Sequence, residues 1–425
     1  MMAFLEKRRF SPRKDGNNLN DGKLDRNVND VMNESSRREV EKSVRSTHFN
    51  TLPAGHKISG YLMYSKKEEI IMKKNLFGFI TAILAMFILS ETVQSATVYN
   101  LRMNVIYPPP MTDWEAKYLT TQVFAKRVAE ATNGQVNIQY FFNSQLSPVA
   151  QGLSALKKGV VDLWSGSSTW GGTVPESDVI WLPYAFHGSE HAMHVMRETE
   201  VGKLFDEAYR KQGSRVLMYW PSGAMIFISR KPIKALEDVK GMKLRFSYAI
   251  WKPWFQRMGV SPVNIAVAEQ YEALMRGTAE ATIYPDYTIE SYKFSEVCKY
   301  ITEPAVVDPG MCYILVSLDK WNSIPADLQK VIEEVALEIE KKTIAATERL
   351  SKEALQKSSE KGVQMIKLSR KEFDKFKDSA MPAWEEFAAR SPECAKMVNI
   401  IKEDIEQWEK SRPESKQWYE KWISK

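Results

Sequence analysis

From residue 96 onward, apolar and polar positions alternate between the periods typical of short strands and of amphipathic helices. Pro108-Pro109-Pro110 ends the first strand and Asn133-Gly134 ends the first helix. The first predicted elements are a strand over 98–106, a helix from Thr112 or Asp113 through Thr132, a strand over 136–142, a helix over 148–158 and a buried strand over 160–164. This order implies parallel strand pairing with helices on both faces of the sheet.

A second set of the same kind follows. It comprises strands over 216–220, 226–229, 242–246, 279–284 and 311–318, a one-turn helix at 236–238, and helices over 251–258 and 269–276. After Pro325 the pattern predicts a helix of about 35 residues, which is about 50 Å long and is expected to brace two lobes. Residues 371–425 have the pattern of further amphipathic helix. The predicted fold class is therefore α/β.

The segment 72–95 has the order of a secretory signal peptide. Lys73 and Lys74 precede a charge-free apolar run over 76–89, and small polar residues lead to a cleavage site near Ser95 and Ala96. The apolar run has 14 residues, fewer than the ~20 that a membrane-spanning helix needs. An uncleaved signal-anchor or a buried helix is the alternative. We expect a mature chain that begins at Ala96 or Thr97 and works outside the cytoplasm.

Residues 1–71 are polar and charged and have no helical or strand period, so they cannot bury a core. A leader of this length ahead of a signal peptide is anomalous. We expect that translation physiologically begins at Met72 and that residues 1–71 are an over-extended start. The rival interpretation is a disordered cytoplasmic tail on an uncleaved anchor.

Setting these segments aside changes the charge of the chain. The formal net charge is +6, of which residues 1–71 contribute +4 and residues 72–95 contribute +1. The remainder is nearly neutral and offers no basic surface for nucleic acid. Its length is near the limit of a single core, so two lobes are expected. The three cysteines are too few for a disulfide scaffold and form no C-x-x-C zinc motif, and Cys298 and Cys312 could either pair or remain free thiols.

Six segments, in the right order, resemble one known family. They are FAKRVAEATNGQVNIQYFFNSQL (124–146), LKKGVVDL (156–163), LPYAF (182–186), LEDVKGMKLR (236–245), VSPVNIAVAEQYEALMRGTAEATIYP (260–285) and WNSIPADLQKVI (321–332). Over about residues 97–375 the chain resembles the solute-binding subunits of tripartite ATP-independent periplasmic (TRAP) transporters.

The resemblance implies a two-lobed, type II-like periplasmic binding protein with hinge strands and a long bracing helix. The expected divisions are lobe I over 96–224, lobe II over 225–310, and a return to lobe I with the bracing and C-terminal helices over 311–425. The implied partners are a small organic acid and the small and large membrane subunits of a TRAP transporter. We expect a periplasmic monomer without a cofactor, a metal or a catalytic residue.

The central ligand contact implied by the resemblance is Arg245, at the end of the K-L-R strand. In the family this Arg grips the ligand carboxylate through two hydrogen bonds, and a planar guanidinium matches a carboxylate in a way that Lys does not. A second Arg of the sialic-acid type would fall near Met225 and is missing here. This difference argues against sialic acid as the ligand.

At the other ligand-binding positions of the family, this chain matches in some places and differs in others. Asn104 matches a position that often bonds the ligand, and Ser167 and Trp170 follow the third strand, where the sialic-acid binders have charged residues. Tyr284 lies where those proteins have an amide.

Aromatic residues take the place of the polar ligand contacts that this chain lacks relative to the sialic-acid binders. They cluster at strand ends, the usual ligand edge of open α/β sheets, although for about half of them we expect core packing. Together they suggest a cleft for an apolar or ring-bearing acid, with Tyr248, Trp170 and Tyr284 as the foremost candidates for ligand contact and Trp220 as a further one. The cluster comprises Trp164, Trp170, Trp181, Tyr184, Tyr219, Trp220, Tyr248, Trp251, Trp254, Tyr284 and Tyr287.

The alternative function is a secreted metal-dependent hydrolase that uses His187, Glu190 and His191, which form an H-x-x-E-H pattern with His194 nearby. Such a site needs both histidines on one face of a continuous helix. Gly188 and Ser189 instead favour a helix that starts near Glu190, with His187 before it and the histidines on the surface of a lobe. The function we expect is therefore a receptor for one organic anion. Which acid it binds does not follow from the sequence.

Overall fold

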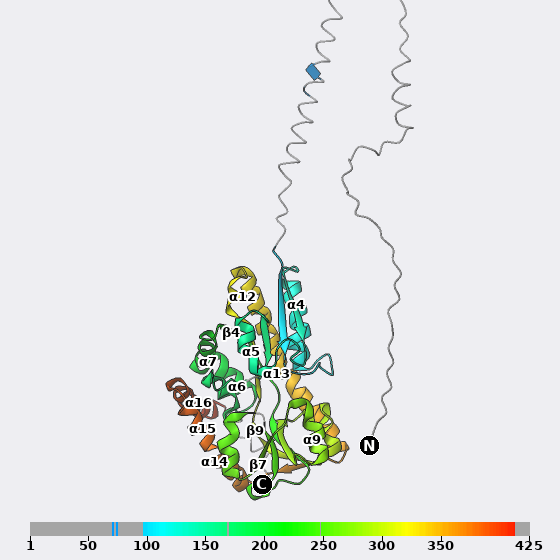
Figure 1. The fold of residues 1–425 in the computed structure, drawn as a ribbon, viewed down its shortest axis with the longest axis vertical. Coiled ribbons are helices and arrows are strands. Elements are labelled where there is room, and N and C mark those ends of the chain that lie inside the picture. Colours follow the sequence, from blue (N-terminus) through cyan, green and yellow to red (C-terminus); the bar gives the residue numbers. More distant parts are fainter. Residues whose placement is uncertain (1–69, 72–73, 75–96, 168–169, 247, 413–425) are drawn as a thin grey trace, which may run out of the picture. The chain divides into compact units, whose positions relative to one another are not determined.

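The computed structural model describes residues 70–71, 74, 97–167, 170–246 and 248–412 (Figure 1). The chain divides into two units, residues 1–93 and 94–425. The predicted signal peptide over 72–95 lies outside the described residues, apart from Lys74, and so does the preceding segment, apart from Ile70 and Ile71. All elements named below belong to the second unit.

Within the described residues, the first sheet has five strands in the order β2-β1-β3-β10-β4. β1 pairs in parallel with β2 and β3, as predicted, whereas β10 runs antiparallel to β3 and β4. The chain passes from β9 in the second sheet into β10 without an intervening helix. The alternation of strands and helices in the sequence therefore did not indicate that β10 is antiparallel. The strands are β1 Tyr99–Val105, β2 Val136–Phe141, β3 Leu163–Gly166, β4 Ser214–Pro221 and β10 Met311–Ser317.

The first helix begins later than predicted. It runs through α3 (Ala116–Tyr118), the π-helical turn η1 (Leu119–Val123) and α4 (Phe124–Ala131), so neither Thr112 nor Asp113 is its N-cap. The side chain of Glu115 accepts hydrogen bonds from the backbone N–H groups of Met111 and Thr112 and keeps these residues in a loop.

The third strand also begins later, at Leu163 rather than at residue 160. The backbone N–H groups of Val160 and Val161 both donate to the carbonyl of Ala155 at the end of α5 (Gly152–Lys157), so these two valines belong to the helix-ending turn.

The second sheet has six strands in the described part of the chain, in the order β11-β9-β5-β8-β6-β7. β5 runs antiparallel to β8 and β9, whereas β6 pairs in parallel with β7 and β8, and β11 in parallel with β9. The apolar pattern missed β7 and β9, which contain Pro262 and Pro304, and β11, which is short and partly exposed. The strands are β5 Met225–Ser229, β6 Lys243–Phe246, β7 Ser261–Asn264, β8 Ala281–Pro285, β9 Tyr300–Val307 and β11 Gln364–Lys367.

Two short connections join the sheets, residues 222–224 between β4 and β5 and residues 308–310 between β9 and β10. They are bonded to each other, since Ser222 N–H donates to the carbonyl of Gly310 and Gly310 N–H donates to the carbonyl of Gly223. A Cβ atom on Gly310 would lie 2.8 Å from Ser222 Oγ and 3.1 Å from Trp181, so a side chain at this close crossing would displace the Ser222 hydroxyl.

The predicted long helix is α13, Ala326–Glu360, with 35 residues. It packs against β4 and α4 on one side and against α10 (Thr288–Ser291) on the other, and Figure 1 shows it running past both sheets. Thr347 on α13 donates to the carbonyl of Pro221, and Ser351 donates to the carboxylate of Asp286, 2.7 Å away. The helix therefore touches both sheets at the point where the connections cross.

The segment over 311–425 was expected to return to lobe I. It instead divides between the sheets, because β10 joins the first sheet and β11 the second.

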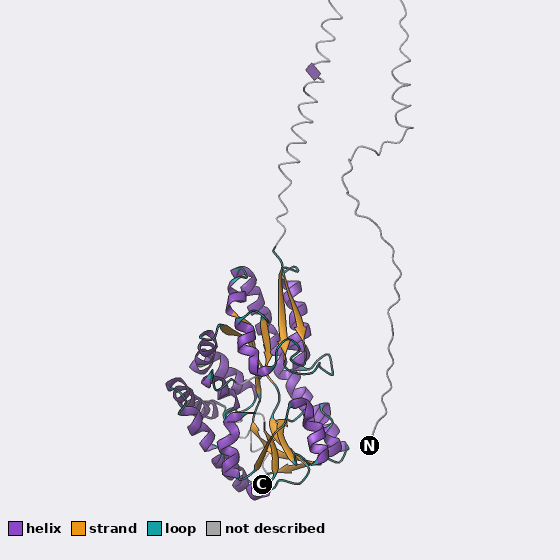
Figure 2. Cartoon of the chain, viewed as in Figure 1, coloured by secondary structure: helices purple, strands orange, loops and turns teal. Residues whose placement is uncertain are grey.

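The remaining helices (purple in Figure 2) cover the sheets, whose strands are orange. Within the described residues, these helices are α6 Ser189–Glu198, α7 Glu200–Arg210, α8 Lys252–Met258, α9 Gln270–Arg276, α11 Phe294–Val297, α12 Leu318–Asn322, α14 Arg370–Ser379, α15 Met381–Ala388 and α16 Pro392–Ser411, with 3₁₀ turns at Val149–Gln151, Pro175–Trp181, Leu236–Val239, Ala249–Trp251 and Val267–Glu269.

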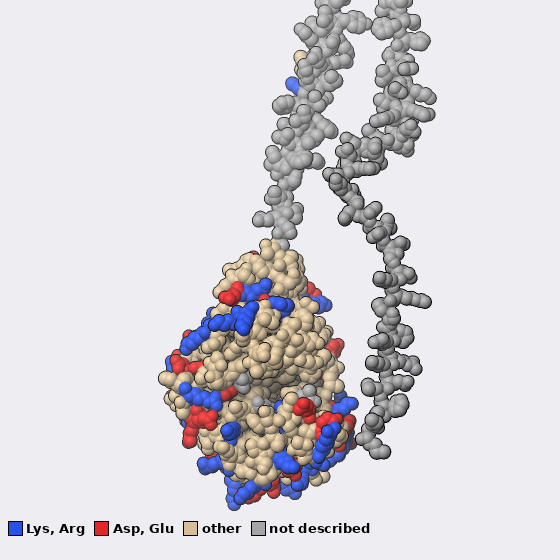
Figure 3. Space-filling view, in the orientation of Figure 1, with Lys and Arg blue, Asp and Glu red and all other residues tan. Residues whose placement is uncertain are grey.

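Charged side chains of both signs are interspersed on the face shown in Figure 3. None of the described helices is long and apolar enough to cross a membrane. Cys298, Cys312 and Cys394 are buried free thiols, so the disulfide considered between Cys298 and Cys312 does not form. Cys312 lies on β10 of the first sheet and instead contacts the hydroxyl of Tyr107, 3.2 Å away.

Candidate functional site: a cavity between the two sheets

A cavity of about 240 Å³ is lined by residues from both sheets. The walls come from the carboxyl ends of β1, β3, β6 and β8 and from the residues after them, the edge at which open α/β folds bind ligands. Four of the seven ligand-contact residues predicted from sequence meet here, Ser167, Arg245, Tyr248 and Tyr284, and Trp181 and Tyr287 of the predicted aromatic cluster line the cavity as well. The full lining is Ile106, Tyr107, Lys117, Val149, Ser167, Trp181, Ser222, Met225, Arg245, Tyr248, Val267, Tyr284, Pro285, Tyr287 and Tyr292.

Arg245 lies on β6 and is only 3% exposed. Its Nε–H donates to the carbonyl of Ile265 at 3.1 Å, and its guanidinium lies 5.2 Å from the centre of the Tyr284 ring. Burial lowers the pKa of Arg245, while Tyr284 and Tyr248 raise it by smaller amounts. An Arg side chain nevertheless stays protonated in proteins. The site therefore holds a buried positive charge on the cavity wall.

Tyr248 and Ser167 connect the two sheets across the cavity. The Ser167 hydroxyl lies 3.3 Å from the hydroxyl of Tyr248 and accepts a hydrogen bond of 2.6 Å from Tyr107. The Tyr248 ring stacks on Trp181, with 3.7 Å between ring centres. Burial raises the pKa values of Tyr107 and Tyr248 well above 10, so both hydroxyls remain neutral hydrogen-bonding groups.

Tyr284, at the end of β8, presents its ring to the same space. It packs edge-on against Tyr292, with ring centres 5.7 Å apart. Burial raises its pKa, which nearby Arg245 lowers by a smaller amount. Tyr284, Tyr287 and Tyr292 thus form an aromatic wall beside the guanidinium.

Three of the residues predicted from sequence lie outside this cavity. Asn104 Nδ2–H donates to the carbonyl of Ser147, and Asn104 Oδ1 accepts from the backbone of Leu146, so Asn104 fixes a loop. Trp170 is buried against Trp164 and donates through Nε1 to the carbonyl of Val149. Trp220 is buried among Tyr107, Ala116 and Cys312. Their predicted ligand contacts are not reflected in the lining of the cavity.

Sequence reasoning missed Lys117, which lines the cavity from α3 and is only 5% exposed. A Lys between Trp114 and Tyr118 in an amphipathic helix is normally expected to face solvent. The available signal was Glu115 two residues earlier, because a buried Lys requires a carboxylate partner. Met225, noted from sequence only for the Arg that it replaces, also lines the cavity.

Comparison with known proteins identifies the family. Residues 111–391 match the profile of the family described as bacterial extracellular solute-binding protein, family 7. The chain belongs to this family. Family-7 proteins are periplasmic, substrate-binding components of transport systems.

Individual relatives agree with this assignment. The C4-dicarboxylate-binding periplasmic protein DctP of Rhodobacter capsulatus is 28% identical over 269 residues, which cover 62% of this chain and 77% of that protein. The sialic acid-binding periplasmic protein SiaP of Vibrio cholerae is 25% identical over 275 residues, covering 64% and 84%. A TRAP periplasmic solute-binding protein from Desulfovibrio salexigens, solved with bound orotic acid, is 24% identical with a TM-score of 0.66, covering 73% of this chain and 99% of that one. The resemblance to TRAP receptors and the two-lobed α/β fold are confirmed.

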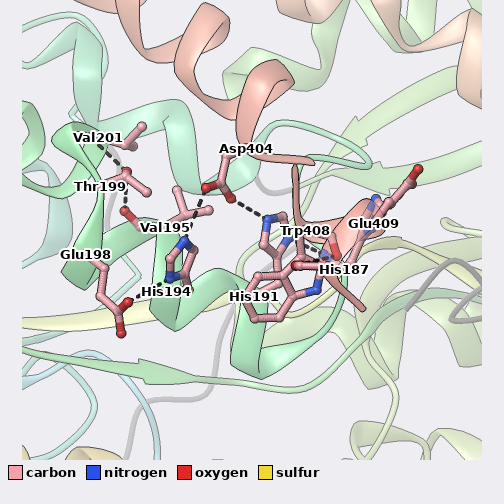
Figure 4. Close-up of polar contacts among 11 residues, drawn as sticks. His187, His191, His194, Val195, Glu198, Thr199, Val201, Asp404, Trp408 and Glu409 are labelled. Atoms are coloured by element: carbon pink, nitrogen blue, oxygen red, sulfur yellow. Dashed lines mark hydrogen bonds and ion pairs between the residues drawn. The ribbon is translucent and has the colours of Figure 1, made fainter. Parts of the chain in front are cut away.

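In this family-7 protein the hydrolase alternative finds no support. Helix α6 begins at Ser189, so His187 precedes it, as expected. The histidines are not surface residues, however: His191 has no exposed surface and His187 is buried (Figure 4). The expectation was wrong because α16 covers this face of α6 with Asp404 and Trp408.

Hydrogen bonds occupy both nitrogens of His191. Nδ1 accepts from the backbone N–H of His187 at 2.9 Å, so Nε2 carries the proton and donates to Asp404 at 2.8 Å. Asp404 also contacts His194 Nε2 at 3.2 Å (Figure 4). Among the described residues, no group of three or more His, Cys, Asp or Glu side chains could hold a metal ion. The cluster joins α6 to α16.

Proposed function

We propose that this family-7 protein is an extracytoplasmic receptor for a small carboxylate with an apolar or ring-bearing body. The observation that carries the proposal is the buried Arg245 guanidinium on the wall of a tyrosine-lined cavity. A carboxylate that leaves water needs a charge-assisted partner, and a guanidinium can donate two parallel hydrogen bonds to it. Arg245 is therefore assigned the role of carboxylate clamp.

The remaining walls favour the apolar part of such a ligand. Trp181, Tyr248, Tyr284, Tyr287 and Tyr292 offer ring faces and edges, and aromatic contacts favour flat or apolar groups. The cavity volume of about 240 Å³ is below the usual range for drug-sized ligands, ~300–1,000 Å³, which favours a small acid.

The named ligands of the relatives are in keeping with an organic anion. The Rhodobacter protein is named for C4-dicarboxylates, and the Desulfovibrio structure contains orotic acid. Sialic acid is disfavoured here, because Met225 occupies the position at which a second Arg would be expected.

The proposal includes the route of the protein and its partners. The signal at 72–95 directs export to the periplasm, and the mature chain delivers its acid, without chemical turnover, to the two membrane subunits of a TRAP transporter. The lobes over 96–224 and 225–310 close around the ligand by bending at residues 222–224 and 308–310. Amino-terminal sequencing of periplasmic protein tests the export step. A chain starting at Ala96 or Thr97 supports it, and peptides from residues 1–71 in that fraction contradict it.

The test of the function is the identity of what the protein retains. Protein purified gently from periplasm is denatured, and the released small molecules are identified by mass spectrometry. The proposal expects an organic acid that raises the melting temperature of stripped protein and is recovered unchanged after incubation. Retention of a neutral or cationic compound instead, or chemical conversion of the acid, would contradict the proposal.

A further inference from the structure

Lys117 is a buried cation that lines the ligand cavity. It lies on α3, which follows β1 of the first sheet, whereas Arg245 lies on β6 of the second sheet. Lys side chains are rarely buried unless they have partners, yet Lys117 is only 5% exposed. Burial lowers its pKa, and Glu115 opposes this shift by smaller amounts. The oxygen atoms that face this group therefore matter for its energy.

Glu115 satisfies the ammonium group of Lys117 only in part. Oε2 of Glu115 lies 3.3 Å from Nζ, while Oε1 accepts hydrogen bonds from the backbone N–H groups of Met111 at 2.7 Å and Thr112 at 2.9 Å. Among the described residues, Oε2 has no hydrogen bond of good geometry, so its contact with Nζ is electrostatic and the N–H groups of Nζ are not directed at it. An ammonium group has three N–H donors. The described residues thus leave N–H donors of Lys117 for oxygen atoms in the cavity.

The position of Lys117 is fixed by its surroundings. Thr121 Oγ1 donates to the carbonyl of Lys117 at 2.6 Å, and Thr120 Oγ1 donates to that of Ala116 at 2.9 Å. The long helix α13 packs against α3, and the attraction of Glu115 holds the end of the Lys117 side chain. A donor that is already in place loses little conformational freedom when a ligand binds.

Resting on the proposed function, we propose that Lys117 is a second ligand-contact residue, which donates a hydrogen bond to an oxygen of the acid outside the carboxylate held by Arg245. A buried N–H donor that faces a ligand carbon has lost its hydrogen bonds to water without replacement, whereas a ligand oxygen replaces them. The preferred class is an acid with a second oxygen function, such as a hydroxyl or a carbonyl group. A plain alkyl or aryl carboxylate binds more weakly.

The experiment compares acids of one skeleton with and without a further oxygen. Stripped protein is titrated calorimetrically at pH 7.5 with benzoate and its three monohydroxy isomers, and with butanoate and 2-, 3- and 4-hydroxybutanoate. The isomers vary the distance between the carboxylate and the hydroxyl. We expect at least one hydroxy acid to bind about tenfold more tightly than its unsubstituted acid. A gain below about threefold for every isomer would overturn the inference and leave the proposed function intact.

A double variant, Lys117→Met with Glu115→Gln, tests the source of this preference. Both charges are removed together, because Lys117→Met alone would leave the buried Glu115 carboxylate without a cation. The preference for the hydroxy acid should fall at least about threefold, which the loss of a purely structural ion pair would not cause. The matched control is Lys126→Met with Glu130→Gln, an exposed pair on α4 with 3.8 Å between Nζ and Oε1, and it should keep the preference. An undiminished preference in the folded Lys117 double variant would overturn the inference.

The titrations of the unaltered protein put the inference at risk even if the double variant does not fold. If this protein binds none of the titrated acids but retains an acid on purification, the retained acid decides. One with a further oxygen function supports the inference, and one whose oxygens all lie in a single carboxylate overturns it. If the protein binds none of the acids and retains none, the proposed function and this inference both fail.

Discussion

Two regions of the protein contain buried ionisable groups that the sequence suggests as candidate functional residues. They are the cavity at Arg245 and the histidine cluster between α6 and α16. At the cavity, Arg245, Ser167 and Tyr248 border a space of about 240 Å³. At the cluster, Asp404 fills the space beside His191 and His194, and Trp408 packs on both rings. The region at Arg245 thus contains a cavity, whereas the histidine cluster is closely packed.

This difference shows that titratable residues alone do not identify a binding site. Both nitrogens of His191 are already hydrogen-bonded within the protein, so its chemistry is used to hold two helices together. Arg245 borders open volume in which an anion can be placed. We infer that the cavity binds ligand and that the histidine cluster stabilises the fold, and the following variants separate the two roles.

The largest effect is expected from Arg245→Ala. It leaves the ligand carboxylate buried without its cationic partner, which should cost about 2–5 kcal/mol, or roughly 30-fold to several-thousand-fold in Kd. Arg245→Lys keeps the charge but not the planar donor pair and should recover only part of this loss. Calorimetric titration with the copurified acid measures both variants. Arg276→Ala is the matched control, because this Arg is exposed and pairs with Glu272 on α9.

Tyr248→Ala should weaken binding by about 1–3 kcal/mol, and more for ring-bearing acids than for short ones, because it removes an aromatic wall. Trp170, expected from sequence to contribute similarly, now serves as the comparison. It lies outside the cavity, so Trp170→Phe should change Kd by less than about threefold. Equal losses of affinity for both variants would mean that the cavity lining does not define the site.

His191→Ala should lower stability without lowering affinity. It leaves Asp404 without its buried donor, a loss of about 1–3 kcal/mol in unfolding free energy. The sequence placed these histidines on the surface, with no effect of their removal on ligand affinity; their burial adds the loss of stability. Urea unfolding and ligand titration measure the two effects. His194→Ala is the comparison variant and should lower stability less, because His194 is partly exposed. A folded His191→Ala that loses ligand affinity tenfold would contradict a purely structural role.

The smallest effect concerns pH. Burial lowers the pKa of His187 to about 3, and Glu409 Oε1, at 3.7 Å, is too far away for a hydrogen bond to it. The unfolded chain binds a proton here below about pH 6.5 and the folded chain does not, so stability falls as pH is lowered from 6.5 toward 3. Between pH 7 and 5.5 this amounts to about 1 kcal/mol. His187→Asn should reduce that slope in urea unfolding, and an unchanged slope would exclude His187 as its source.

The order of elements was predictable because local periodicity encodes it, as in α13, where both the start after Pro325 and the length agree. β9 was missed because Pro304 interrupts its pattern. Within the site, Arg245 was predictable only through the family motif. Lys117 was not, because its burial depends on the loop that positions Glu115.

The aromatic residues show the same limit. Tyr248 and Trp170 both follow strand ends, yet Tyr248 lines the cavity, whereas Trp170 packs against Trp164 and is not part of the lining. Nothing in the local sequence separates the two. The difference arises from how each ring packs. Tyr248 stacks on Trp181, which is distant in the sequence. Trp170 packs on Trp164, a contact that depends on the loop between these two residues.

The central claim is that Arg245 binds the carboxylate of the ligand, and a cycle of two ligands and two proteins tests it most directly. The copurified acid and its uncharged primary amide are titrated into the parent and into folded Arg245→Ala. The account predicts that the parent prefers the acid strongly and that the variant loses this preference, with a coupling of about 2 kcal/mol or more. An Arg245→Ala protein that binds the acid within about threefold of the parent, under ~0.7 kcal/mol, and keeps the same preference over the amide would contradict it.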